Sequence, residues 1–139
     1  MLTSIMIEIV LENCLPLPWK APYVGSRGAF SPRYNEAKII KAMIREQYTG
    51  SLILGEIRLD FEFSFPVPKR TSKKKTALML EGSIRPQGGG DLDNLRKFHC
   101  DLLQGIVFED DRQVIEGYAI KKYDQKPSVY ISIDLRGVR

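Results

Sequence analysis

Acidic residues gather around one lysine between residues 91 and 111, and their types suit chemistry on phosphate. The cluster comprises Asp91, Asp93, Asp101, Glu109, Asp110 and Asp111, with Lys97 among them. Hard divalent cations such as Mg²⁺ take oxygen ligands and usually need few protein carboxylates, because water and substrate phosphate complete the coordination shell. The chain has 21 Lys and Arg against 17 Asp and Glu, so this negative site belongs to a net positive protein. The composition therefore indicates a metal-dependent phosphoryl-transfer site whose substrate is a nucleic acid.

The helix expected over residues 91–103 places the chemical groups on one side. At about 100° per residue, its apolar side holds Leu92, Leu95, Phe98, His99, Leu102 and Leu103. The other side holds Asp93, Asn94, Lys97 and Asp101. Asp91 is expected at the N-cap, where non-helical dihedral angles let its carboxylate turn toward the same metal as Asp93. His99, on the apolar side, is expected to be packed and hydrogen-bonded rather than catalytic.

Asp111 bears on the choice between a metal site and ordinary helix capping. Aspartate at a helix N-terminus commonly serves as a cap, and an Asp93–Lys97 pair at i,i+4 contributes only roughly a few tenths of a kcal/mol. Asp110 and Asp111, however, stand at the entry of the next expected strand, which can return Asp111 to the side of Asp91 and Asp93. Three carboxylates meeting there would repel one another strongly without a cation. We therefore predict that Asp91, Asp93 and Asp111 bind Mg²⁺, with Asp101 and Asp110 in supporting roles.

The elements that hold these residues follow a mixed α+β pattern. Strands are expected over residues 4–12, 56–65, 113–122 and 128–135, and helices over residues 32–50 and 91–103. The order β-α-β-(basic loop)-α-β-β predicts a small mixed sheet with two main helices, in one domain that spans residues 1–139. Residues 56–65 alternate apolar and polar side chains throughout, so this strand is expected to be antiparallel, with one buried and one wet face.

Local signals place the boundaries of the first half of the chain. Ser31 is expected to be the N-cap of the first helix and Pro32 its first residue, with the helix ending near Gly50. Residues 15–30 contain prolines and glycines and are expected to form an irregular loop.

A basic segment precedes the acidic cluster. Five of the seven residues from Lys69 to Lys75 are Lys or Arg, and periodicity is lost from Pro66 to Gly90, which predicts a long loop. A basic run in general is a solvated, disordered segment. Its adjacency to the acidic motif instead favours contact with DNA phosphates, which gives affinity without sequence reading. The predicted DNA-binding residues are Lys69, Arg70, Lys73, Lys74, Lys75 and Arg85.

Several classes of protein are disfavoured. The apolar run from Ile5 to Leu11 is far shorter than the roughly 20 residues of a membrane span and lacks the flanks of a targeting segment. Cys14 and Cys100 make neither a zinc-ligand spacing nor a disulfide framework, which fits a reducing compartment. The three glycines at 88–90 are not followed by the Gly-Lys-Ser/Thr of a P-loop. We expect a cytoplasmic protein with no membrane attachment and no nucleotide cofactor.

The acidic motifs together resemble a known family. The segment Asp91-Leu92-Asp93-Asn94-Leu95, Lys97, residues 101–103 and residues 110–114 are similar to the signature of the RusA family of Holliday-junction resolvases. These are small Mg²⁺-dependent endodeoxyribonucleases of prophages and bacteria. The resemblance is close over residues 91–122 and looser over the whole chain. It implies catalytic aspartates at Asp91, Asp93 and Asp111 and a catalytic lysine at Lys97.

The resemblance also implies a substrate and an assembly. It implies a homodimer that binds four-way DNA junctions and nicks two opposing strands to leave 5′-phosphates, in DNA recombination and repair. A homodimer agrees with the approximate two-fold symmetry of a junction. Two alternatives stay open: a non-enzymatic nucleic-acid-binding module whose acids only cap and pair, and a phage nuclease that acts on forks or flaps.

Overall fold

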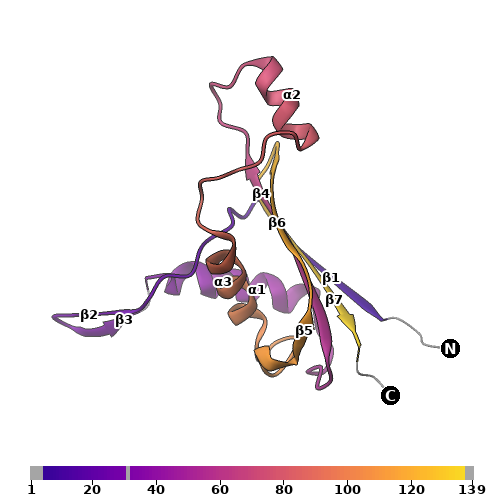
Figure 1. Ribbon diagram of the computed structural model, residues 1–139. Helices are drawn as coiled ribbons and strands as arrows, with labels where there is room; N and C mark the ends of the chain where they lie inside the picture. Colours follow the sequence, from indigo (N-terminus) through magenta and orange to yellow (C-terminus); the bar gives the residue numbers. More distant parts are fainter. Residues whose placement is uncertain (1–4, 31, 137–139) are drawn as a thin grey trace.

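The computed structural model describes residues 5–30 and 32–136, and for Phe30 the backbone only. Its elements are, in order, β1 (Met6–Glu12), β2 (Tyr23–Gly25), β3 (Gly28–Phe30), α1 (Tyr34–Gln47), β4 (Ile57–Pro66), α2 (Lys73–Glu81), α3 (Leu92–Leu103), the short 3₁₀ helix η1 (Asp111–Gln113), β5 (Val114–Glu116), β6 (Ala119–Asp124) and β7 (Ser128–Leu135). Figure 1 shows α1 and α3 on the same side of a twisted sheet. The predicted α+β class is confirmed, with a third helix, α2, beyond the two that were expected.

The sheet is mixed, as predicted. Its order is β1-β7-β4-β5, and β6 also pairs with β4. β7 is antiparallel to both β1 and β4, whereas β5 and β6 run parallel to β4. The C-terminal strand β7 therefore lies in the middle of the sheet, between the N-terminal strand and β4.

The polar face of β4 is less exposed than expected, because side chains and backbone of the neighbouring segments cover part of it, and β4 is antiparallel to β7 but parallel to β6. Asp60 and Ser64, on its polar side, are buried. The Asp60 carboxylate accepts hydrogen bonds from the Arg58 side chain at 3.0 Å and from the Tyr118 N–H at 2.8 Å. Lys122 Nζ donates to Glu62 at 2.7 Å. The polar side chains of β4 thus bind one another and their neighbours in place of water.

Gly117 divides the strand expected over residues 113–122 into β5 and β6. A Cβ at this position would lie 1.9 Å from the carbonyl oxygen of Leu59, and its φ of +153° belongs to the region that favours glycine. The backbone of Gly117 therefore touches β4 directly. Beyond it, the Phe61 N–H donates to the Tyr118 carbonyl at 3.0 Å, and pairing with β4 resumes along β6.

Each of the two helices beside the sheet buries one face, and for α3 this is the face that was expected. Leu95, Phe98, His99, Leu102 and Leu103 of α3 are buried, as the helical wheel predicts. In α1 the buried residues are Ile40 and Ile44. No helix of the described residues has the length and apolar composition that crossing a membrane requires.

The start of α1 differs from the prediction. The N-cap is Arg33, which makes no capping hydrogen bond through its side chain, and the helix runs from Tyr34 to Gln47. Pro32 therefore precedes the helix instead of opening it, and the helix ends before Gly50. The predicted N-cap Ser31, like Ser4 of the predicted first strand, lies outside the described residues.

Two segments expected to be loops contain regular structure. Within residues 15–30, β2 and β3 pair as an antiparallel hairpin that projects from the body of the protein (Figure 1). Within the basic segment, Ser72 caps α2 by accepting the Lys75 N–H at 3.2 Å, and Gly82 ends that helix with a φ of +94°. Only Met79 of α2 is buried, so the helix has no apolar stripe from which periodicity could identify it.

Candidate active site

A cavity of about 400 Å³ opens between α3 and the β4–β5 part of the sheet. It is lined by Leu59, Phe61, Asp93, Arg96, Lys97, Cys100, Asp101, Asp111 and Val114. The strands supply the apolar residues, α3 supplies two carboxylates and two cations, and η1 supplies the third carboxylate. The structure therefore brings Asp93, Lys97 and Asp111, which were predicted from different parts of the sequence, to one cavity.

Asp111 is held by the turn in which it lies. Asp110 caps η1, and its carboxylate accepts the Arg112 N–H at 2.9 Å. Gln113 completes a capping box, because its Oε1 accepts the Asp110 N–H at 2.8 Å. Its Nε2 also donates to the carbonyls of Ile53 and Gly55, at 2.7 and 2.9 Å. Gln113 was not identified from the sequence, although the Asp-x-x-Gln spacing is a capping signal.

The cavity has a negative character that suits a cation. Burial raises the pKa of the Asp101 carboxyl, Lys97 opposes this shift, and the charge of Asp111 adds to it. Burial, followed by the charges of Asp101 and Asp111, raises the pKa of the Cys100 thiol to about 12. A carboxylate whose ionisation is disfavoured in this way is stabilised by a bound cation.

Asp110 has partners of its own. The Arg112 backbone N–H and then its side chain lower the pKa of the Asp110 carboxyl to about 2. The two side chains also form an ion pair, with Arg112 Nε at 3.2 Å from Asp110 Oδ1. Its hydrogen bonds hold the turn that carries Asp111.

Asp91 lies at the N-cap of α3, where it was predicted. One carboxylate oxygen accepts the Asn94 N–H at 2.8 Å, and the other accepts from Asn94 Nδ2 at 3.2 Å. Asp91 does not line the cavity that contains Asp93 and Asp111. Accordingly, no three His, Cys, Asp or Glu side chains in the described part of the chain are placed to hold one ion together. Asp93 and Asp111 do supply the oxygen donors that a hard divalent cation requires.

Lys97 lies against an aromatic ring that the sequence did not reveal. Its Nζ is 3.7 Å from the centre of the Trp19 ring, a cation–π distance. The backbone N–H of Trp19 donates to the Asn94 carbonyl at 2.9 Å, and Arg33 Nε donates to the Pro18 carbonyl at 3.3 Å. The segment around Trp19 is therefore fixed to the first turn of α3, next to the ammonium that it contacts.

Lys121 is a second residue that sequence reasoning missed. Its Nζ donates to the carbonyls of Gly88 and Gly90, at 2.7 and 2.8 Å, and to Gln87 at 3.3 Å. It thereby holds the glycine segment that leads into Asp91. The segment is closely packed, because a Cβ on Gly89 would lie 2.4 Å from the Phe65 ring. These are contacts across long sequence separations, and no local motif signals them.

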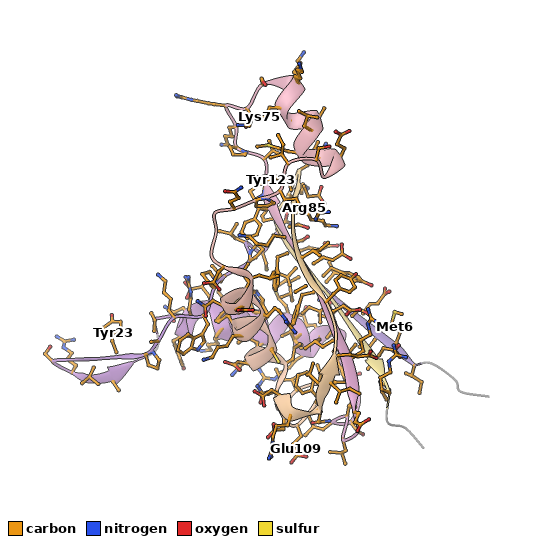
Figure 2. All side chains as sticks on the ribbon, in the orientation of Figure 1. Met6, Tyr23, Lys75, Arg85, Glu109 and Tyr123 are labelled. Atoms are coloured by element: carbon orange, nitrogen blue, oxygen red, sulfur yellow. The ribbon has the colours of Figure 1, made fainter. Side chains whose placement is uncertain are left out.

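The predicted DNA-binding residues lie apart from the cavity. Lys73, Lys74 and Lys75 are exposed on the first turn of α2, and α2 packs against β6. Figure 2 shows Lys75 at one end of the molecule and Glu109, near η1, at the other. Lys69 and Arg70 are exposed in the turn before α2, and Arg85 donates to the Lys121 carbonyl at 3.3 Å. The basic segment does not fold over the acidic cavity.

Comparison with known proteins supplies an independent finding. Residues 16–134 match the family described as Endodeoxyribonuclease RusA. The chain is also 33% identical over 95 residues to the uncharacterized protein YqaN of Bacillus subtilis (strain 168). That alignment covers 66% of this chain and 67% of YqaN. The family match includes each residue that lines the cavity, and Trp19 and Lys121 as well.

Proposed function

Because the chain belongs to the RusA family of endodeoxyribonucleases, we propose that it resolves four-way DNA junctions by Mg²⁺-dependent paired nicks that leave 5′-phosphates. The reaction would serve DNA recombination and repair. The observation that carries this proposal is the cavity in which Asp93 and Asp111 lie with Lys97. Carboxylates for a cation and an ammonium for a phosphate are the groups that phosphodiester hydrolysis requires.

The metal ligands in this proposal are Asp91, Asp93 and Asp111. Asp93 and Asp111 reach the cavity from α3 and η1, and Asp91 is two residues from Asp93 at the mouth of the helix. The Asp91 oxygen that accepts from Asn94 Nδ2 can exchange this hydrogen bond for a metal ion. Bound there, Mg²⁺ would orient the scissile phosphate, acidify a water and stabilise charge on the leaving 3′-oxygen.

The side chains of the protein have defined tasks in this scheme. Lys97 places a positive charge where negative charge grows on the phosphate, and Trp19 holds its ammonium at the cavity. Asp101, which accepts from Gln104 Nε2 at 3.2 Å, adds a negative charge near Lys97. Leu59 and Phe61 form an apolar floor, and an apolar wall strengthens the electrostatic interactions beside it.

DNA affinity comes from the basic residues away from the cavity. Lys69, Arg70, Lys73, Lys74, Lys75 and Arg85 are proposed to contact phosphates of a junction arm. The three lysines occupy the N-terminal turn of α2, where positive charge opposes the helix dipole. These lysines do not stabilise the helix at this position, so we attribute their presence there to the binding of an external anion.

A homodimer is proposed because a junction needs two related incisions and each chain supplies one candidate active site. Figure 1 shows the sheet face opposite α1 and α3 without a helix over it. Met6 and Tyr118, which lie on strands of this sheet or at their ends, are 56% and 43% exposed. Sedimentation equilibrium at micromolar concentration should give about twice the 15.9 kDa of the chain. A monomeric mass with and without junction DNA would refute the paired-incision scheme.

The activity is tested with synthetic DNA. A four-way junction, a fork and a linear duplex are each incubated with the protein in Mg²⁺ or in EDTA. We expect nicks in the junction, in Mg²⁺ only, that a ligase can reseal. Binding without cleavage would instead identify a nucleic-acid-binding module, and preferential cleavage of the fork would identify a fork nuclease.

A further inference from the structure

A row of cations on α1 takes no part in the site described so far. Tyr34, Lys38, Lys41 and Arg45 follow one another at intervals of four, three and four residues. At 3.6 residues per turn this spacing places them on one face of the helix. Together with Ala37, these four residues line a shallow cavity of about 210 Å³. We refer to Tyr34, Lys38, Lys41 and Arg45 as the α1 cationic face.

Among the described residues, none forms an ion pair with the α1 cationic face. In the part of the chain that the structure describes, every ion pair uses cations other than Lys38, Lys41 and Arg45. Glu36, the acid nearest the start of the helix, pairs instead with Arg33 at 3.8 Å. Like charges three or four residues apart on a helix repel one another. The row therefore costs the free protein stability, and a bound polyanion would remove that cost.

The other contacts of α1 place this face away from β1. The opposite side of α1 faces β1, since Met43 contacts Cys14 and Gln47 bonds the backbone of Val10. On the helical wheel, Met43 lies roughly 170° from the middle of the cationic face. The other helix that packs against α1 is α3, which carries the cavity residues. The α1 cationic face thus lies on the side of α1 away from β1. Its N-terminal end is near the first turn of α3, because Arg33 bonds the Pro18 carbonyl and the backbone N–H of the next residue, Trp19, bonds the Asn94 carbonyl.

We propose that the α1 cationic face binds the phosphate backbone of one duplex arm of the DNA whose branch point lies at the cavity. The inference rests on the proposed function and adds a second contact surface to it, separate from α2. From Tyr34 to Arg45 the face extends about 16 Å, at about 1.5 Å per residue. At about 3.4 Å per base pair, this length matches roughly five phosphates of one strand. The Tyr34 hydroxyl adds a neutral hydrogen-bond donor to the three cations.

The first test compares salt dependence. The variant Lys38→Gln/Lys41→Gln/Arg45→Gln should bind junctions more weakly, and the slope of log K against log salt should fall by about 2 to 3, at roughly 0.9 for each phosphate bound. The rate of Mg²⁺-dependent nicking at saturating protein should stay unchanged. The matched control sets Lys41→Gln against Lys126→Gln, because each removes one charge and Lys126 lies in the β6–β7 turn. Equal effects of these two single variants would show a response to net charge and overturn the proposal.

The second test locates the bound arm of the DNA. Junctions are prepared in which about five consecutive phosphates of one arm are replaced by uncharged methylphosphonates, at increasing distance from the branch point. At one position of the neutral segment, wild-type protein should bind the modified junction more weakly than the unmodified one. The triple variant, which already binds weakly, should bind both junctions equally well. An equal loss for both proteins at every position would mean that the α1 cationic face is only solvated. If wild-type protein binds in this pattern but nicks no DNA, the proposed function fails and the α1 contact stands.

Discussion

The cavity beside α3 and the helix α2 carry opposite charges, and the protein builds them in different ways. At the cavity, Asp111 is fixed by the capping box of Asp110 and Gln113, and Lys97 rests on Trp19. At α2, only Met79 is buried, and the lysines of its first turn extend into solvent. Chemistry on a phosphodiester requires groups held in fixed positions, whereas attraction of a polyanion requires only charge. This difference gives each region its own set of expected mutational effects.

The largest effect is expected at the carboxylates of the cavity. Asp93→Asn or Asp111→Asn should abolish cleavage, because each removes a proposed metal ligand with almost no change of shape. Junction binding should remain intact or become tighter, because each variant removes one negative charge that repels phosphate. Nicking rates and gel-shift affinities measured in Mg²⁺ test both expectations. Turnover at the wild-type rate in either variant would show that the metal site is assigned incorrectly.

Lys97→Ala should have the next largest effect. A well-placed electrostatic stabiliser contributes on the order of 3 kcal/mol to lowering a barrier, so cleavage should slow by a factor of about one hundred or more. Binding should fall only slightly, which single-turnover rates at saturating protein can separate from affinity. Normal turnover with reduced affinity would make Lys97 a phosphate anchor of the same kind as the α2 lysines.

The contact of Lys97 with Trp19 sharpens this experiment. Trp19→Leu should slow cleavage less than Lys97→Ala, because a cation–π contact is worth about 0.5 to 2 kcal/mol. In the double variant the Trp19 change should add almost nothing, since its effect acts through the ammonium. Fully additive reductions in single-turnover rate would show that Trp19 acts independently of Lys97.

The core side of α3 should make the cavity region sensitive to acid. Burial lowers the pKa of His99 from 6.5 to about 4. Its Nδ1 donates to the Leu95 carbonyl at 2.8 Å, and Nε2 is buried without a hydrogen-bond partner among the described residues. In the unfolded chain, His99 therefore binds a proton as the pH falls through 6.5. In the folded protein it does so only when the pH falls to about 4. Stability should decline through this window at up to roughly 1.4 kcal/mol per pH unit.

Denaturant unfolding at several pH values measures this dependence. The variant His99→Leu keeps an apolar side chain against Phe61, Phe63 and Phe98 and removes the titrating group. Its stability should change much less than that of the wild type between pH 6.5 and 4.5. Parallel pH profiles for the two proteins would contradict the assignment of the acid sensitivity to His99.

Short-range patterns explain which parts of the structure could be predicted. The alternation of residues 56–65 identified β4, and the wheel of residues 91–103 identified the buried face of α3, because each pattern reflects burial directly. The neighbours of β4 could not be read from its own sequence, so the burial of Asp60 and Ser64 was missed. The helix α2 was not predicted, because the segment between its capping residues has no apolar stripe.

The residues of the candidate site also fall into those that the sequence predicted and those that only the structure reveals. Asp93, Lys97 and Asp111 were found from their residue types, and the structure places them in one cavity. Trp19 and Lys121 support them from positions far away in sequence, through contacts that appear only after the chain has folded. Gly117 likewise has no local signal for its approach to the Leu59 carbonyl. A local motif thus predicts the candidate reacting groups, and the tertiary structure determines which contacts hold them.

The smallest effect on chemistry is expected at α2. Replacing Lys73, Lys74 and Lys75 together by Ala should weaken binding to junction and duplex alike, and should reduce the log–log salt slope by roughly 0.9 for each phosphate that the lysines neutralise. The nicking rate of bound junction should not change, because α2 packs against β6 at a distance from the cavity (Figure 2). Helix stability should rise slightly, since the substitution removes positive charge from the positive end of the helix dipole. An unchanged slope would identify the three lysines as solvated, and a slower nicking rate at saturation would mean that this remote region takes part in positioning the DNA for cleavage.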